Sequence, residues 1–83
     1  MYHIKKNEIE LLSNELLNLG LSLRDFSILR DIKSDSFNII ESKGDTFLVF
    51  YLDEKGVKNY ECELNSFDDA GNYLKELIKH LKY

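Results

Sequence analysis

The chain has 83 residues, of which 43% are hydrophobic and 31% are charged, and its formal net charge is -4 at pH 7. These proportions are typical of a single folded domain with a small core, and they exclude a disordered chain. The negative charge argues against a nucleic-acid partner, whose phosphates need a basic surface, and favours a basic protein partner.

Cys62 is the only cysteine in the chain. Since it has no internal disulfide partner, we expect the protein to work in a reducing compartment. The first residues do not have the pattern of a signal peptide, and no apolar run approaches the length that spans a membrane. We therefore expect a cytoplasmic protein with no membrane partner.

The first element in the chain is an expected amphipathic helix over residues 6–19. Its apolar residues at helical spacing are Ile9, Leu12, Leu16 and Leu19. Gly20 follows them and is expected to end the helix in the left-handed conformation. Within residues 25–29, Phe26 and Ile28 then predict a short strand with both side chains pointing inward.

The rest of the chain is organised around residues 46–52, the one long unbroken apolar and aromatic run. Its β-branched and aromatic residues, with Gly44 and Gly56 on either side, predict a strand. Both of its faces are apolar, because Leu48, Phe50 and Leu52 alternate with Phe47, Val49 and Tyr51. Such a strand is expected in the middle of a sheet, with a covering layer or a partner on each side.

A hairpin is expected on each side of this central strand. Residues 37–41 form the preceding strand, and Lys43-Gly44 is its expected two-residue loop. This loop length places Ile39 opposite Leu48.

The second hairpin is expected to turn at Gly56, in the left-handed conformation, and to continue with an alternating strand over residues 57–64. Its register places Phe50 opposite Tyr60.

These two registers divide the sheet into two faces. The predicted core face, on which both helices pack, carries Phe37, Ile39, Leu48, Phe50, Leu52, Tyr60, Cys62 and Leu64. The predicted outer face carries Asn38, Ile40, Phe47, Val49, Tyr51, Asn59, Glu61 and Glu63. The outer face therefore has an aromatic centre and an acidic flank, which suits a basic protein partner.

A second amphipathic helix is expected after Ser66, with Ser66 as the N-cap and Asp69 as its acidic partner. Its apolar stripe is Ala70, Tyr73, Leu74, Leu77, Ile78 and Leu81. The element order is then α-β-β-β-β-α. This order predicts a single two-layer α+β domain over residues 1–83, with a four-stranded, mainly antiparallel sheet.

Few residues of the chain point to catalysis or metal binding. His3 lies near the N-terminus, and His80 lies in the last expected helical turn, where it complements the helix dipole. Cys62 is expected to be a small core residue. The sequence contains no recognisable nucleophile–base pair, zinc set, calcium loop or phosphate loop. We therefore expect no enzyme activity, no catalytic residue, no metal and no cofactor.

The aromatic strand continues into Glu54-Lys55-Gly56, and the last helix opens with Phe67-Asp68-Asp69-Ala70. Together with the N-terminal helix and the Phe26-Ser27-Ile28 strand, this pattern resembles small α+β immunity proteins of bacterial polymorphic toxin systems. In that family the strand often ends in Glu-Arg-Gly. Lys55 stands here at the arginine position and lacks the bidentate hydrogen bonding of a guanidinium group.

The resemblance implies a protein that binds and neutralises a cognate toxin, often a nuclease with a basic groove, without turnover. The expected partner-binding residues are Phe47, Val49, Tyr51, Asp53, Glu54, Glu61 and Glu63. If the helices cover the outer face instead, the interface is expected at the acidic turns around Asp45 and Asp53. The alternative is a homo-oligomeric structural module, such as a homodimer, or a small regulatory adaptor.

Overall fold

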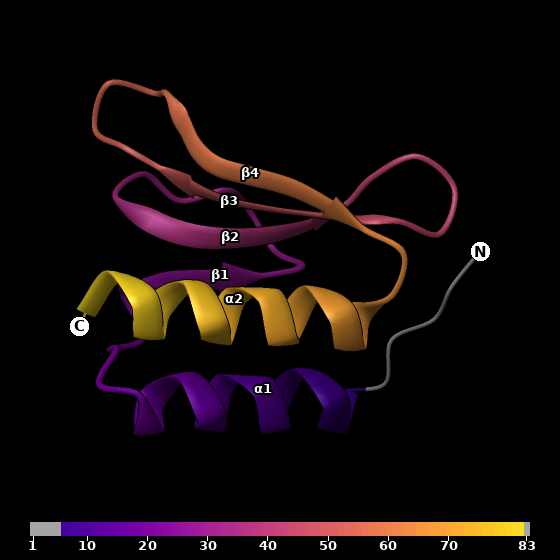
Figure 1. Ribbon diagram of the computed structural model, residues 1–83, viewed down its shortest axis with the longest axis horizontal. Helices are drawn as coiled ribbons and strands as arrows, with labels where there is room; N and C mark the ends of the chain where they lie inside the picture. The colour runs from indigo at the N-terminus through magenta and orange to yellow at the C-terminus, as the bar shows by residue number, and fades with distance from the viewer. Residues whose placement is uncertain (1–5, 83) are drawn as a thin grey trace.

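The computed structural model describes residues 6–82, which form two helices and four strands (Figure 1). In chain order these elements are α1 (Lys6–Asn18), β1 (Phe26–Ile28), β2 (Ser36–Glu41), β3 (Phe47–Leu52), β4 (Lys58–Leu64) and α2 (Phe67–Lys82). The strands form one sheet in the order β1-β2-β3-β4. β1 and β2 are parallel, and the other neighbouring pairs are antiparallel. The predicted element order and the α+β class are therefore confirmed.

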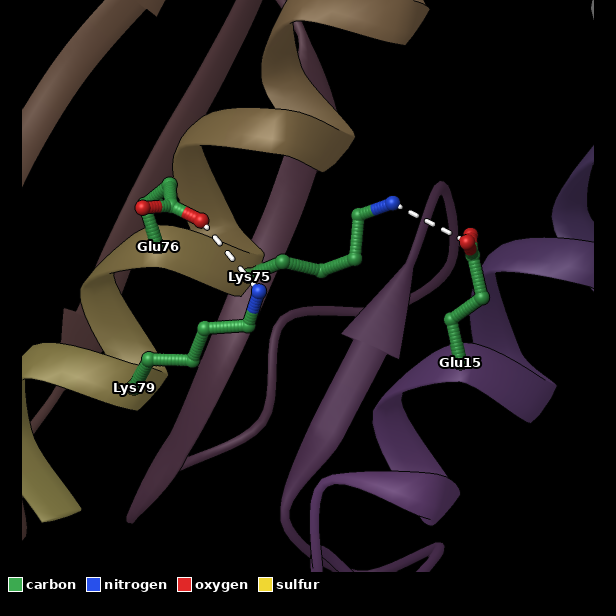
Figure 2. Close-up of polar contacts among 4 residues, drawn as sticks. All are labelled: Glu15, Lys75, Glu76 and Lys79. Atoms are coloured by element: carbon green, nitrogen blue, oxygen red, sulfur yellow. Dashed lines mark hydrogen bonds and ion pairs between the residues drawn. The ribbon is translucent and has the colours of Figure 1, made fainter.

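The two helices lie side by side on one face of the sheet and run in the same direction (Figure 1). Leu12 of α1 packs against Gly71 of α2, where a Cβ atom would lie 3.2 Å from Leu12 Cδ1. One turn further along, the Nζ atom of Lys75 on α2 lies 3.0 Å from a carboxylate oxygen of Glu15 on α1 (Figure 2). The missing side chain at Gly71 therefore allows the two helices to pack closely.

The ends of the helices lie at the residues that predicted them. Gly20 has a φ of 100°, and the N–H of Leu21 donates a hydrogen bond to the carbonyl of Leu16. A left-handed glycine therefore ends α1, as expected. At the start of α2, the N–H of Asp69 donates to Ser66 Oγ at 3.1 Å, which makes Ser66 the N-cap.

The hydrophobic core lies between the helices and the sheet. Its buried residues are Leu12, Leu16, Phe26, Ile28, Phe37, Ile39, Phe47, Val49, Phe67, Ala70, Leu74 and Ile78. The inward placement of Phe26 and Ile28 is confirmed. Leu48 and Phe50 lie outside this cluster, because Phe47 occupies the core side of β3 together with Val49. The predicted faces of β3 were therefore reversed.

The loop between β2 and β3 explains the reversal. The N–H of Ser42 donates to the carbonyl of Thr46 at 2.8 Å, so the loop between these residues has three residues rather than two. Ile39 consequently lies opposite Val49 and not opposite Leu48. Because side chains alternate along a strand, a shift of one residue moves all of them to the other face.

The β3–β4 hairpin follows its predicted register only near the turn. As expected, the N–H of Asp53 donates to the carbonyl of Val57 at 3.0 Å. Further along, a β-bulge shifts the register, so that Val49 lies opposite Cys62. Cys62 therefore lies on the core side, as predicted, whereas Tyr60 is 50% exposed.

The second face of the sheet is covered in part by the loop between β1 and β2. Asn38 of β2 is fully buried on this face, where it accepts a hydrogen bond from Lys33 N–H at 2.9 Å and donates one to the Lys33 carbonyl at 3.0 Å. The Ser27 hydroxyl of β1 donates to the carbonyl of Asp31 at 2.7 Å. These bonds hold the loop against the sheet. Phe50 points to this second face and is also fully buried.

Candidate protein-binding site on the β3–β4 hairpin

The aromatic half of the predicted interface lies beneath the helices. Phe47 and Val49 are 1% and 0% exposed. The Phe47 ring also packs edge-to-face against Phe67 of α2, with ring centroids 5.9 Å apart. A partner cannot contact either side chain while the helices are in place. Their assignment as partner-binding residues is therefore corrected, and the cause is the three-residue loop that turns both of them towards the core.

Tyr51 lies on the same face as these two residues, at its margin, and is half-buried. Its ring packs edge-to-face against Phe37, with centroids 4.9 Å apart. Burial raises the pKa of the Tyr51 hydroxyl, and four nearby carboxylates raise it further. These carboxylates belong to Asp35, Asp25, Asp53 and Glu54. Tyr51 therefore lies on the helical side of the sheet and not on the outer face predicted for it.

The turn of the hairpin is held by Asp53. Its Oδ1 atom accepts hydrogen bonds from the N–H groups of Lys55 and Val57, both at 2.9 Å. The bond from Val57 has the largest influence and holds the pKa of the Asp53 carboxyl below its ordinary value. The carboxylate of Asp53 is thus engaged in shaping the turn, whereas the neighbouring Glu54 is exposed.

The remaining predicted acidic residues lie on β4. Glu61 and Glu63 are both exposed. Glu63 lies opposite Leu48 and accepts a hydrogen bond from the Thr46 hydroxyl. Both side chains are therefore exposed, as the sequence led us to expect, and one oxygen of Glu63 is bound by Thr46.

Tyr60 is a candidate residue for contact with a partner, and the sequence alone does not reveal it. It lies at the β-bulge of β4 with a φ of 58°, a conformation that bulky residues rarely adopt. The hydroxyl of Tyr73 on α2 donates to the Tyr60 carbonyl at 2.9 Å, which helps to hold this backbone conformation. The regular alternation of residues 57–64 hides the bulge, because it places Tyr60 on the core face.

The exposed side chains of the hairpin combine apolar and acidic groups. Val57 is 53% exposed and Tyr60 is 50% exposed. We define the hairpin surface as Glu54, Val57, Tyr60, Glu61 and Glu63. Lys55 and Lys58 lie on the same hairpin, and the Nζ atom of Lys58 is 5.1 Å from the centroid of the Phe50 ring. The hairpin surface offers an aromatic contact and several carboxylates to a basic partner.

Other residue types that carry chemistry are dispersed in the structure. Cys62 is a half-buried free thiol, and His80 is exposed near the end of α2. His3 lies outside the described residues. Within residues 6–82, no group of three Asp, Glu, His or Cys side chains is placed to hold a metal ion. No helix in this part of the chain is long and apolar enough to cross a membrane.

No protein-family model matches the chain, and no curated protein or solved structure is significantly similar to it. The function is therefore inferred from the sequence pattern, the charge and the geometry of the hairpin surface.

Proposed function

We propose that the protein is an immunity protein that binds a cognate bacterial toxin in a stoichiometric complex and neutralises it through the hairpin surface. The observation that carries this proposal is Tyr60, an exposed aromatic side chain in a strained backbone conformation. Strained non-glycine residues cost about 1–3 kcal/mol each and cluster at functional sites. Exposed aromatic side chains are frequent anchors of protein–protein interfaces.

The charge of the protein supports a basic partner. The chain has a net charge of -4, and Glu54, Glu61 and Glu63 are exposed on the same hairpin as Tyr60. Carboxylates around an aromatic anchor complement the groove of a nuclease-type toxin, which is basic because it binds phosphates. They would accelerate association, while Tyr60 would slow dissociation.

The experiment is co-expression with the protein encoded immediately upstream of this one. We expect survival of cells that produce that upstream protein, and a one-to-one complex in sedimentation velocity. Survival without a complex, or a complex without protection, would contradict stoichiometric neutralisation.

Tyr60→Gly separates binding from folding. Glycine adopts the φ of 58° without strain, so the urea midpoint should stay the same or rise. Loss of an interface anchor should nevertheless raise the dissociation rate by about thirtyfold, the equivalent of a hot spot of about 2 kcal/mol. If dissociation is unchanged, Tyr60 is not an anchor and the proposed contact surface is wrong.

Glu61→Lys tests the acidic part of the hairpin surface. It should slow association and weaken its salt dependence, because steering by exposed charges is screened by salt. Glu76→Lys is the matched control, since the Glu76 side chain is 76% exposed on α2 and its exposed ion pair with Lys79, at 3.4 Å, is worth little. Equal effects of both variants would indicate a response to net charge alone. A homodimer that forms without a partner, and that Tyr60→Gly dissociates, would favour the homo-oligomeric alternative.

A further inference from the structure

A groove with a volume of about 510 Å³ lies between α1 and the edge strand β1. Leu17 of α1 and Leu23, which precedes β1, both line this groove. They are 38% and 66% exposed, so each leaves apolar surface in contact with water. Ile9 of α1 extends the apolar lining. An exposed apolar surface of this kind is typical of a site that binds a partner.

The charge of the groove is opposite to that of the whole chain. Its lining includes three cationic side chains, Lys6, Arg30 and Lys33, but only one carboxylate, that of Glu10. Lys6 and Arg30 make no ion pair with any other residue among 6–82. The Nζ atom of Lys33 donates to the carbonyl of Leu23 at 3.3 Å, at the rim of the groove. The groove is therefore a local positive site in a chain with a net charge of -4.

The backbone of β1 provides further polar groups. Among the strands of residues 6–82, β1 lies at the edge of the sheet and pairs only with β2. The N–H of Leu29 donates to the carbonyl of Ile39 at 2.8 Å, which shows that Leu29 directs its amide towards β2. In a strand, alternate residues direct their backbone groups to opposite sides. The N–H and C=O groups of Phe26 and Ile28 therefore point away from β2, and because these residues are only 6% and 4% exposed, a narrow strip of β1 backbone reaches the groove that they line.

We propose that this groove binds an extended segment of a partner protein in which acidic residues alternate with apolar ones. The apolar side chains of the segment would contact Leu17 and Leu23, and its carboxylates would pair with Arg30 and Lys6. Arginine is well suited to this role, because its guanidinium group binds a carboxylate through two parallel hydrogen bonds. The backbone of the segment would follow β1, as strands that add to the edge of a sheet do. The groove and the hairpin surface carry opposite charge, so this inference goes beyond the proposed function and does not depend on it.

The test uses two fluorescein-labelled hexapeptides, Leu-Glu-Leu-Glu-Leu-Glu and Leu-Lys-Leu-Lys-Leu-Lys, with the full-length protein. In fluorescence anisotropy the acidic peptide should bind, and any binding of the basic peptide is expected at the acidic hairpin surface and not in the groove. Amide resonances of Leu17, Leu23 and Arg30 should shift in NMR spectra of the ¹⁵N-labelled protein with the acidic peptide. Absence of binding by the acidic peptide, groove shifts of equal size with both peptides, or shifts confined to other residues would overturn the proposal.

Two pairs of variants locate the site. Arg30→Glu should weaken binding of the acidic peptide at least about tenfold, as expected when one partner of a close charge pair is reversed. Lys55→Glu on the hairpin changes the net charge equally and should leave binding within about twofold. Leu23→Ser should also weaken binding, whereas Leu11→Ser should not, although Leu11 is 62% exposed and so nearly as accessible as Leu23.

Equal losses within either pair would overturn the proposal, because the effect would then come from net charge or from general hydrophobicity. Sedimentation equilibrium tests whether a second copy of the chain, and not a partner segment, occupies the groove. A homodimer that Leu23→Ser dissociates would show that a second copy of the chain fills the groove. The co-expression experiment tests the hairpin surface with different variants and a different readout. Failure of one proposal is therefore distinguishable from failure of the other.

Discussion

Replacing Asn38 tests whether its hydrogen bonds hold the β1–β2 loop over the second face of the sheet. Its side chain is fully buried and makes three hydrogen bonds. It accepts one from Lys33 N–H at 2.9 Å, and it donates one each to the carbonyls of Lys33 and Ser36 at 3.0 Å. Asn38→Ala removes all three bonds and leaves the loop without its main attachment to β2.

The expected loss follows from the number of bonds. Each hydrogen bond contributes a net of about 0.5–1.5 kcal/mol, so the three together contribute about 1.5–4.5 kcal/mol. Lys33 lies in an exposed part of the loop, and its backbone groups can bind water once the loop lifts. We therefore expect a loss of about 2–3 kcal/mol in the free energy of unfolding. With a slope of about 1 kcal/mol per M, this lowers the urea midpoint by about 2–3 M.

Asn72→Ala is the matched control, because Asn72 is exposed on α2. It should change the free energy of unfolding by less than about 0.5 kcal/mol. Asn38→Asp gives a second readout: burial raises the pKa of a carboxyl group, and stability is then lost as the pH rises through that pKa. The loss in the free energy of unfolding caused by Asn38→Asp should accordingly be larger at pH 7 than at pH 4. If Asn38→Ala unfolds at the same urea concentration as Asn72→Ala, the loop does not depend on Asn38 and the reasoning is refuted.

Three further predictions concern the core and the pH dependence of stability. Phe47→Ala should lower the free energy of unfolding by about 3–5 kcal/mol in urea denaturation, because its ring is 1% exposed. An unchanged urea midpoint would contradict the placement of Phe47 in the core. Gly71→Val should cost about 1–3 kcal/mol in thermal unfolding by crowding Leu12, and the double variant with Leu12→Ala should lose less than the sum of the two single losses if the two residues are in contact. The pKa of Tyr51 is raised above its ordinary value of 10.0 in the folded protein, so stability should fall as the pH rises above about 10. Tyr51→Phe should reduce this fall, and an equally steep fall in the variant would contradict the assignment.

The elements that the sequence predicts well are those that local signals define. Ser66 caps α2 through a bond to an amide three residues away, and Gly20 ends α1 in its own left-handed conformation. Each of these signals acts within one helical turn, so neighbouring residues are enough to locate it. The helices, the turn at Gly56 and the order of the elements along the chain could therefore be predicted.

The register of β3 could not be predicted because its sequence is apolar on both faces. In most strands, polar residues on one face reveal which side meets water. Phe47 and Phe50 have nearly the same preference for burial, and both are indeed buried, on opposite faces of the sheet. One additional residue in the β2–β3 loop then decided which of them faces the helices.

The hairpin surface was predictable only in its charged part. Glu61 and Glu63 were expected to be exposed because carboxylates are costly to bury. Tyr60 was hidden by a bulge that interrupts a regular alternation of side chains. The groove that includes Leu17 and Arg30 was not foreseen, because it forms where α1 meets β1 and no local pattern describes that contact.

The loop over the second face begins at Leu29 and ends at Asp35, both of which are left-handed, with φ values of 56° and 57°. The sheet is therefore covered on one side by apolar packing of helices, and in part on the other by a segment that polar bonds hold to β1 and β2. Native-state hydrogen exchange should detect opening of the loop and opening of the helices as two separate events. We expect the loop to open while α1 and α2 remain folded, because its opening relieves the strain at Leu29 and Asp35 and breaks only polar bonds. Exchange of the amides that the loop protects would then not require global unfolding.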